Sequence, residues 1–138
     1  MAKRIILLLL VLTSLATIYA LVASSDRQFD VVAWREAKFS QVSDGHDIDH
    51  EYTLRYQMVN DLVTTKLSLG ATSRDRIREL LGDPESADGS PYSISVGRYD
   101  AYIIRYRYNI IDYDTEYLIL RYDADDKLKS TQRKTVQG

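Results

Sequence analysis

The sequence contains no cysteine, only two prolines and one tryptophan among 138 residues, and its charges nearly balance. Without cysteine the chain has no disulfide, no thiolate metal site, no cysteine nucleophile and no N-terminal cysteine for lipid attachment. A formal net charge of −2 lacks the basic excess expected of a nucleic-acid binder. The motifs Gly-x-Ser-x-Gly and Gly-x-x-x-x-Gly-Lys are also missing. We therefore expect no enzyme activity, no cofactor and no nucleic-acid partner.

The N-terminus carries the strongest local signal. Lys3 and Arg4 precede residues 5–23, which contain no charge. A basic start followed by an apolar run is typical of a secretory signal, and the run is also long enough for a membrane-spanning helix. We predict that residues 1–24 are a signal peptide or an uncleaved membrane anchor, a buried core segment being the third alternative. In the first two cases the rest is exported, to the periplasm or to the periplasmic side of the inner membrane.

Residues 25–48 show no clean periodicity and are interpreted as an irregular lead segment. We expect a short extended or helical stretch that docks Phe29 and Trp34 on the core, and a turn at residues 43–45. The domain proper is predicted over residues 49–138.

Two helices are predicted at the start of this domain. Over residues 49–67, Leu54, Met58 and Leu62 recur every four positions, which is the spacing of a helix with one buried face. A second helix is predicted over residues 73–81, because Ser73 suits an N-cap and Gly82 suits a helix end.

After a loop at residues 83–91 the hydrophobic period changes to two, which indicates strands. Strands are expected at residues 92–96, 102–108 and 117–122, and from residue 127, with a turn at residues 123–126. The predicted fold is α+β, with two helices packed on one face of a three- to four-stranded antiparallel sheet after the N-terminal signal or anchor helix.

Two segments of the chain resemble a known family, SmpA/OmlA (BamE-like). Residues 70–84, GATSRDRIRELLGDP, are similar to its hallmark of glycine, a hydrophobic residue, a capping Thr or Ser, a short helix ending in Leu-Gly, one residue and proline. Residues 117–128, YLILRYDADDKL, resemble its second signature, an aliphatic strand that turns through acidic residues. Further similarity to a subgroup of small exported bacterial proteins lies at Phe29, Asp30, Trp34, Arg55, Met58, Asp61 and Leu62.

The resemblance implies two helices on a three-stranded antiparallel sheet and a non-enzymatic interaction role. The best-known member is an accessory of outer-membrane protein assembly, and a related architecture inhibits β-lactamase. This chain departs from the family in two ways. Its lead-in has one extra residue, so that Gly70 or Ala71 holds the turn, and it has no cysteine to acylate, whereas many members are outer-membrane lipoproteins.

The segment DGHDIDHE at residues 44–51 is the one candidate for metal chemistry. On a helix, His46 and His50 would share a face, a spacing that can hold zinc. Asp47 stands where a zincin has its catalytic Glu, and no third ligand is evident. We therefore favour a solvated acidic helix start, with a structural or adventitious metal site as the next alternative and a metal-dependent hydrolase as a remote one.

A patch of Arg, Tyr and aliphatic residues is predicted on the sheet. If Leu118 and Leu120 face the helices, the alternate residues face outward and would form an exposed partner-binding surface. Its members are Ile103, Arg105, Arg107, Tyr117, Ile119 and Arg121. The alternative is a solvated face that is stabilised by cross-strand pairs.

Two functional hypotheses follow. The first is a non-enzymatic exported protein of the cell envelope that binds another envelope protein through the sheet face or an edge strand, in outer-membrane protein assembly or envelope integrity. The second is a binder or inhibitor of a periplasmic enzyme that uses the loop at residues 83–91.

Overall fold

The computed structural model describes residues 26–37, 54–90, 94–108 and 113–137. In chain order the elements are α2 (Val31–Glu36), α3 (Leu54–Asp61), the π-helical turn η1 (Leu62–Lys66), α4 (Arg74–Leu81), β1 (Ser86–Ala87), β2 (Tyr99–Tyr108), β3 (Tyr113–Tyr122) and β4 (Leu128–Gln137). The predicted signal or anchor, residues 1–24, and the histidine cluster, residues 44–51, lie outside the described residues. Among the helices that are described, none is long and apolar enough to cross a membrane.

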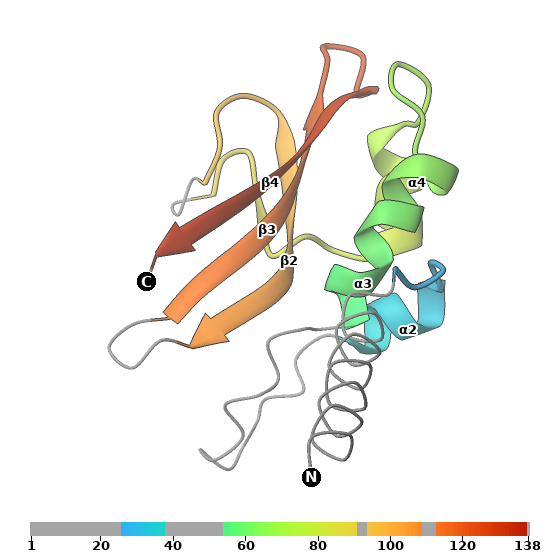
Figure 1. Cartoon of the computed structure of the whole chain (residues 1–138). Helices are drawn as coiled ribbons and strands as arrows, with labels where there is room; N and C mark the ends of the chain where they lie inside the picture. Colours follow the sequence, from blue (N-terminus) through green and yellow to red (C-terminus); the bar gives the residue numbers. More distant parts are fainter. Residues whose placement is uncertain (1–25, 38–53, 91–93, 109–112, 138) are drawn as a thin grey trace, which may run out of the picture.

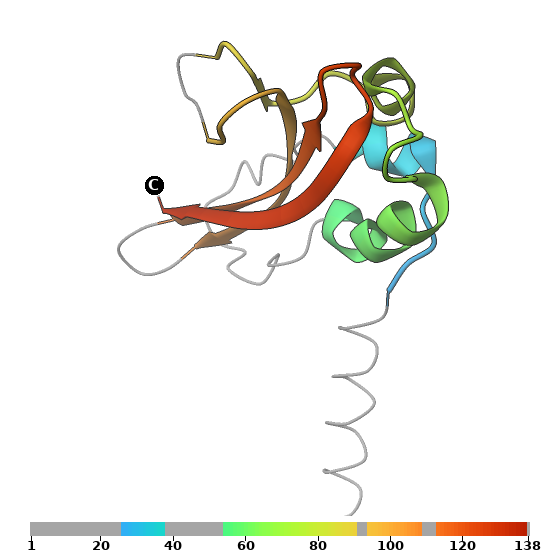
Figure 2. The same ribbon diagram turned by 90° about the horizontal axis from the view of Figure 1, so that it is seen from above.

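The strands form one antiparallel sheet in the order β1-β2-β3-β4, which confirms the α+β class. Figures 1 and 2 show α2, α3 and α4 on the same side of this sheet. Because neighbouring strands follow one another in the chain, the sheet is an antiparallel meander, as the period-two pattern predicted. Two expected features differ. β1 is only Ser86–Ala87 and falls inside the predicted loop, and residues 94–96 are bends rather than a strand.

The main core lies between the helices and the sheet. Leu118, Leu120 and Tyr122 of β3 are buried there, so the predicted orientation of this strand is confirmed. They meet Met58 of α3 and Ile77 of α4, both fully buried. The other helix-side members are Phe29, Trp34, Val59, Leu62, Leu67, Leu81, Tyr102, Ile104 and Leu128.

The lead segment docks as expected, and it does so as a helix. Asp30 caps α2, its side chain accepting a hydrogen bond from Ala33 N at 2.7 Å. Phe29 N donates to the Asp61 carboxylate, also at 2.7 Å, so the approach to α2 is tied to the end of α3. The Phe29 and Trp34 rings pack with their centroids 5.8 Å apart.

α4 begins and ends where its sequence predicted. The Ser73 hydroxyl accepts a hydrogen bond from Arg76 N, and Gly82 takes the positive φ of 82° that ends the helix. Tyr102 of β2 donates its hydroxyl proton to the Gly82 carbonyl at 3.0 Å, which fastens this helix end to the sheet.

The helix predicted over residues 49–67 changes type after Asp61. In η1 the Leu67 amide bonds to the carbonyl of Leu62, five residues back, at 3.2 Å. The hydroxyls of Thr64 and Thr65 donate to carbonyls four residues back. Such bonds compete with the α-helical pattern, which accounts for the wider final turn.

Candidate functional site

The β3 residues of the predicted surface patch face as expected, but the patch is not an exposed surface. Tyr117, Ile119 and Arg121 do point away from the helices, as alternation with Leu118 and Leu120 required. However, Ile119 is completely buried in a second small core with Tyr99 and Ala101, against which Tyr117 packs. The expectation of an open apolar face was therefore wrong at this position.

The segment at residues 94–98 covers this part of the sheet. Arg121 Nε donates to the Ser95 hydroxyl at 3.1 Å, and Lys134 Nζ of β4 donates to the Ile94 carbonyl at 2.6 Å. Ile94 itself packs on the second core. Because side chains from both β3 and β4 reach this segment, it spans the sheet face that was expected to be free.

Arg105 lies on the opposite face from the one predicted. A register shift follows Ile103, which pairs with Tyr117, whereas Arg105 pairs with Glu116. This β-bulge inserts one extra residue and reverses the alternation beyond it. Arg105 is consequently 2% exposed on the helix side, where it lies 4.5 Å above the Tyr56 ring and 3.3 Å from the Glu116 carboxylate.

The remaining predicted patch residues are also in β2. The backbone groups of Ile103 point away from β3: its N–H donates to the Glu85 carboxylate at 2.9 Å, and its carbonyl accepts from Arg55 at 3.0 Å. Arg107 is placed in the strand by its pairing with Asp114. The structure thus brings Tyr117, Ile119 and Arg121 together on one face and separates Arg105 from them.

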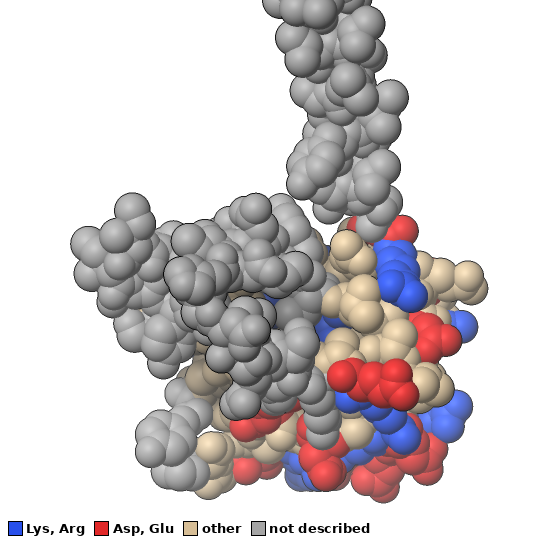
Figure 3. Space-filling model, turned by 90° about the horizontal axis from the view of Figure 1, so that it is seen from below, with Lys and Arg blue, Asp and Glu red and all other residues tan. Residues whose placement is uncertain are grey.

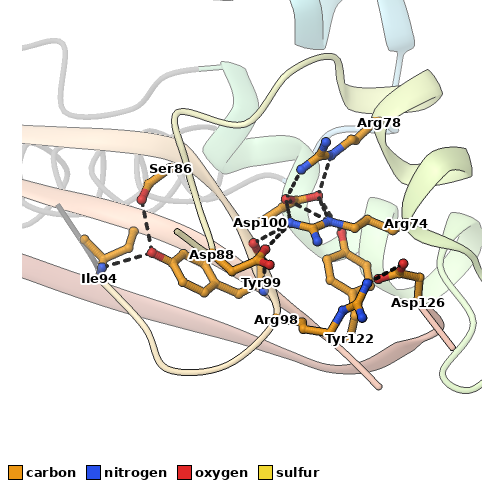
Figure 4. Close-up of polar contacts among 10 residues, drawn as sticks. All are labelled: Arg74, Arg78, Ser86, Asp88, Ile94, Arg98, Tyr99, Asp100, Tyr122 and Asp126. Atoms are coloured by element: carbon orange, nitrogen blue, oxygen red, sulfur yellow. Dashed lines mark hydrogen bonds and ion pairs between the residues drawn. The ribbon is translucent and has the colours of Figure 1, made fainter. Parts of the chain in front are cut away.

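A buried carboxylate, Asp100, anchors α4 to β2 (Figure 4). Asp100 is completely buried. Arg78 donates to it at 2.7 and 3.0 Å, and the closest contact from Arg74 is 2.7 Å. The Tyr122 hydroxyl donates at 3.0 Å, and Arg74 also pairs with Asp88.

The hydrogen bonds of this cluster favour its charged form. Burial alone would raise the pKa of Asp100, but the hydrogen bonds from Arg78 and Arg74 outweigh it and leave the pKa below its usual range. The hydrogen bond with Asp100 raises the pKa of Arg74. Burial and the nearby Asp100 charge raise the pKa of Tyr122. A carboxylate with every neighbour donating to it is a poor proton acceptor, so the cluster serves the fold.

A second buried arginine joins three elements. Arg55 of α3 is 2% exposed and lies 5.1 Å from the Trp34 ring centroid. Its Nε donates to the Trp34 carbonyl at 3.0 Å, and its Nη1 pairs with Glu85 at 2.9 Å. Glu85 and Asp88, both in the predicted inhibitory loop, thus pair with Arg55 and Arg74 and hold that loop against the body of the domain.

On the side of the molecule shown in Figure 3, the described surface mixes both signs of charge. Acidic and basic side chains alternate over the side shown, so no large field of one sign develops there. Within the described ranges, no group of three or more metal-ligating side chains comes together.

The outer edge of β4 is the one long stretch of sheet backbone left open among the described residues. Ala101 and Tyr99 of β2 direct their carbonyls toward the β1 side, where Glu85 N and Asp88 N donate to them at 3.0 and 3.1 Å. In an antiparallel sheet the backbone groups of successive residues point alternately to the two sides of the strand, and two paired residues point either toward each other or away from each other. Through the register of β2, β3 and β4, the backbone groups of Thr131, Arg133 and Thr135 therefore point outward.

Only the start of this edge is closed. Leu128 N donates to the Thr72 carbonyl at 2.8 Å, and the Leu128 carbonyl accepts from Gly70 N at 2.7 Å. Beyond this point no backbone partner from the described residues reaches the outward groups of β4. An open row of alternating donors and acceptors is a template for another strand.

The open edge is also basic. Residues 127–137 carry Lys127, Lys129, Arg133 and Lys134 and contain no acidic residue. None of the four forms an ion pair with a carboxylate among the described residues. Lys134 donates to the Ile94 carbonyl, and Arg133 donates to the Asn60 side-chain oxygen at 2.8 Å. An edge strand was one of the two expected binding modes, but none of the predicted site residues lies in β4, although the run of cations and β-branched residues in LKSTQRKTVQ was a visible signal.

Comparison with known proteins adds no relative: no family model, no curated protein and no solved structure matches this chain. The open edge of β4 is thus the candidate site on geometry alone.

Proposed function

We propose that this chain is a non-enzymatic, exported cell-envelope protein that acts by protein–protein interaction, with the outer edge of β4 as its binding site. Residues 5–23 would serve as its export signal or its membrane tether. The BamE-like resemblance of residues 70–84 and 117–128 supports an accessory role in outer-membrane protein assembly or envelope integrity.

The observation that carries the proposal is the outward-facing backbone of Thr131, Arg133 and Thr135, which has no backbone partner among the described residues. Main-chain hydrogen bonds at a free sheet edge provide affinity for an extended segment of a partner, and the side chains on either face provide specificity. Two other parts of the sheet are occupied: residues 94–98 cover the face around Ile119, and Glu85 with Arg55 occupies the β2 edge at Ile103.

A proline at position 135 tests this binding mode directly. Thr135→Pro removes an outward N–H and leaves the hydrogen bonds between β3 and β4 in place, because proline is tolerated at edge positions whose N–H faces solvent. Thr135→Val is the matched control, since it keeps the N–H group. Full-length tagged protein carrying each substitution is cross-linked in the bacterial envelope, and the captured partner is identified and quantified.

We expect Thr135→Val to retain the wild-type partner and Thr135→Pro to lose it, with both proteins giving the far-ultraviolet circular dichroism of the wild type. Retention of the same partner by a folded Thr135→Pro protein would refute binding through this edge.

A further inference from the structure

We infer that the strand accepted by β4 is an acidic one, with carboxylates opposite Arg133 and Lys134; this inference rests on the proposed function. Thr131, Arg133 and Thr135 offer N–H and carbonyl groups at every second residue, which is the repeat that an incoming extended peptide matches.

The charge of the edge selects the chemistry of this peptide. Lys127, Lys129, Arg133 and Lys134 are not neutralised by any carboxylate in the described part of the chain. Side chains directly opposite each other in neighbouring strands attract when their charges are opposite and repel when they are alike. An acidic residue is therefore favoured opposite Arg133 and Lys134, which lie on the open part of the edge, and a basic residue is disfavoured there.

Arg133 is held in place for such a contact. Its guanidinium lies 5.0 Å from the Tyr56 ring centroid, and Nη2 donates to the Asn60 oxygen at 2.8 Å. Arg133 is nevertheless an exposed residue, and its other N–H groups have no acceptor among the described residues. Because the ring and the amide already restrain the side chain, a carboxylate would bind with a smaller loss of side-chain entropy.

The same charges argue against a second copy of this chain as the occupant. An antiparallel pair of β4 strands would place Lys and Arg of one copy near Lys and Arg of the other, without an intervening acid. Cations on an edge strand are a known means of preventing self-association. They leave the edge open to an acidic strand.

The test uses three nine-residue peptides with the full-length protein in a non-ionic detergent. Each peptide has alternating threonine and valine around a central pair, which is Glu-Asp, its isostere Gln-Asn, or Lys-Lys. Affinity is measured by titration at low and high salt. Hydrogen exchange of the Thr131, Arg133 and Thr135 amides, followed by NMR, reports whether the peptide has joined the sheet.

We expect the Glu-Asp peptide to bind about ten-fold or more tightly than the Gln-Asn peptide at low salt, and to slow exchange at all three amides. Arg133→Gln combined with Lys134→Gln should remove this preference. Lys66→Gln, which removes an exposed cation from η1, should leave it unchanged.

Each of the other outcomes would contradict either the acidic specificity or the binding mode itself. If the Gln-Asn peptide binds equally well and protects the same amides, the acidic specificity is wrong and strand addition stands. If no peptide protects these amides, both the inference and the proposed binding mode fail. Protection of the same amides by self-association, or binding of the cations to anionic lipid vesicles without protection, would assign the edge to a different occupant.

Discussion

Replacing Asp100 by Asn is expected to destabilise the domain strongly without changing its shape. Asn keeps the volume and one acceptor oxygen but removes the negative charge that faces Arg74, Arg78 and the Tyr122 hydroxyl. Removing one member of a buried ion pair costs about 3–5 kcal/mol. Arg78 is 39% exposed and can regain water, and Arg74 keeps Asp88, so the expected loss is smaller, about 2–3 kcal/mol.

This loss is measured by urea unfolding of the full-length protein, followed by the fluorescence of Trp34. Trp34 is the only tryptophan and is completely buried, so its emission reports the opening of the core. Asp88→Asn is the matched control, because it removes a carboxylate from the same arginine at a position that is 35% exposed. Its expected loss is below about 1 kcal/mol. Equal losses for the two variants, or a loss below about 0.5 kcal/mol for Asp100→Asn, would refute the assignment of Asp100 as the main anchor.

The stability of the domain should also depend on pH and on the side chain at position 105. Because the folded-state pKa of Asp100 is lowered, its contribution to stability is present above the unfolded pKa of about 4 and is lost as pH falls through the folded pKa. Urea unfolding between pH 7 and pH 3 should therefore show a smaller acid-induced loss of stability for Asp100→Asn than for the wild type. Parallel curves of stability against pH would contradict this. Arg105→Glu places a second carboxylate beside Glu116 on the buried side of the sheet and should lower the free energy of unfolding by about 3–5 kcal/mol. Arg121→Glu only loses a hydrogen bond to Ser95 and should lower it by about 1 kcal/mol in the same assay. Equal losses would contradict the reversal of alternation at the bulge.

The two arginines of that comparison also show how a surface interpretation from sequence can fail. In the sequence, Arg105 and Arg121 occupy equivalent positions in alternating strands, which suggests a double substitution as the test of one binding surface. In the structure Arg105 is buried against Tyr56 and Glu116. A loss of partner binding in that double variant would therefore report unfolding as readily as a lost contact.

Local sequence determined those parts of the fold that depend on neighbouring residues. Ser73 and Gly82 set the ends of α4 because a side-chain cap and a positive φ act within one helical turn. The alternation in residues 117–122 placed Leu118 and Leu120 in the core, since the period of a strand is two. The acidic turn and the cations after it were equally visible in the sequence.

The tertiary structure alone decided what is exposed and what is open. The bulge after Ile103 depends on how β2 meets β3, so no periodicity within β2 reveals that Arg105 turns inward. The cover over Ile119 comes from residues 94–98, which sequence reasoning assigned in part to a strand. The open edge of β4 exists because the meander stops there, while the β2 edge is occupied by β1, Glu85 and Arg55. These are contacts between residues far apart in the chain, and packing of the whole domain selects them.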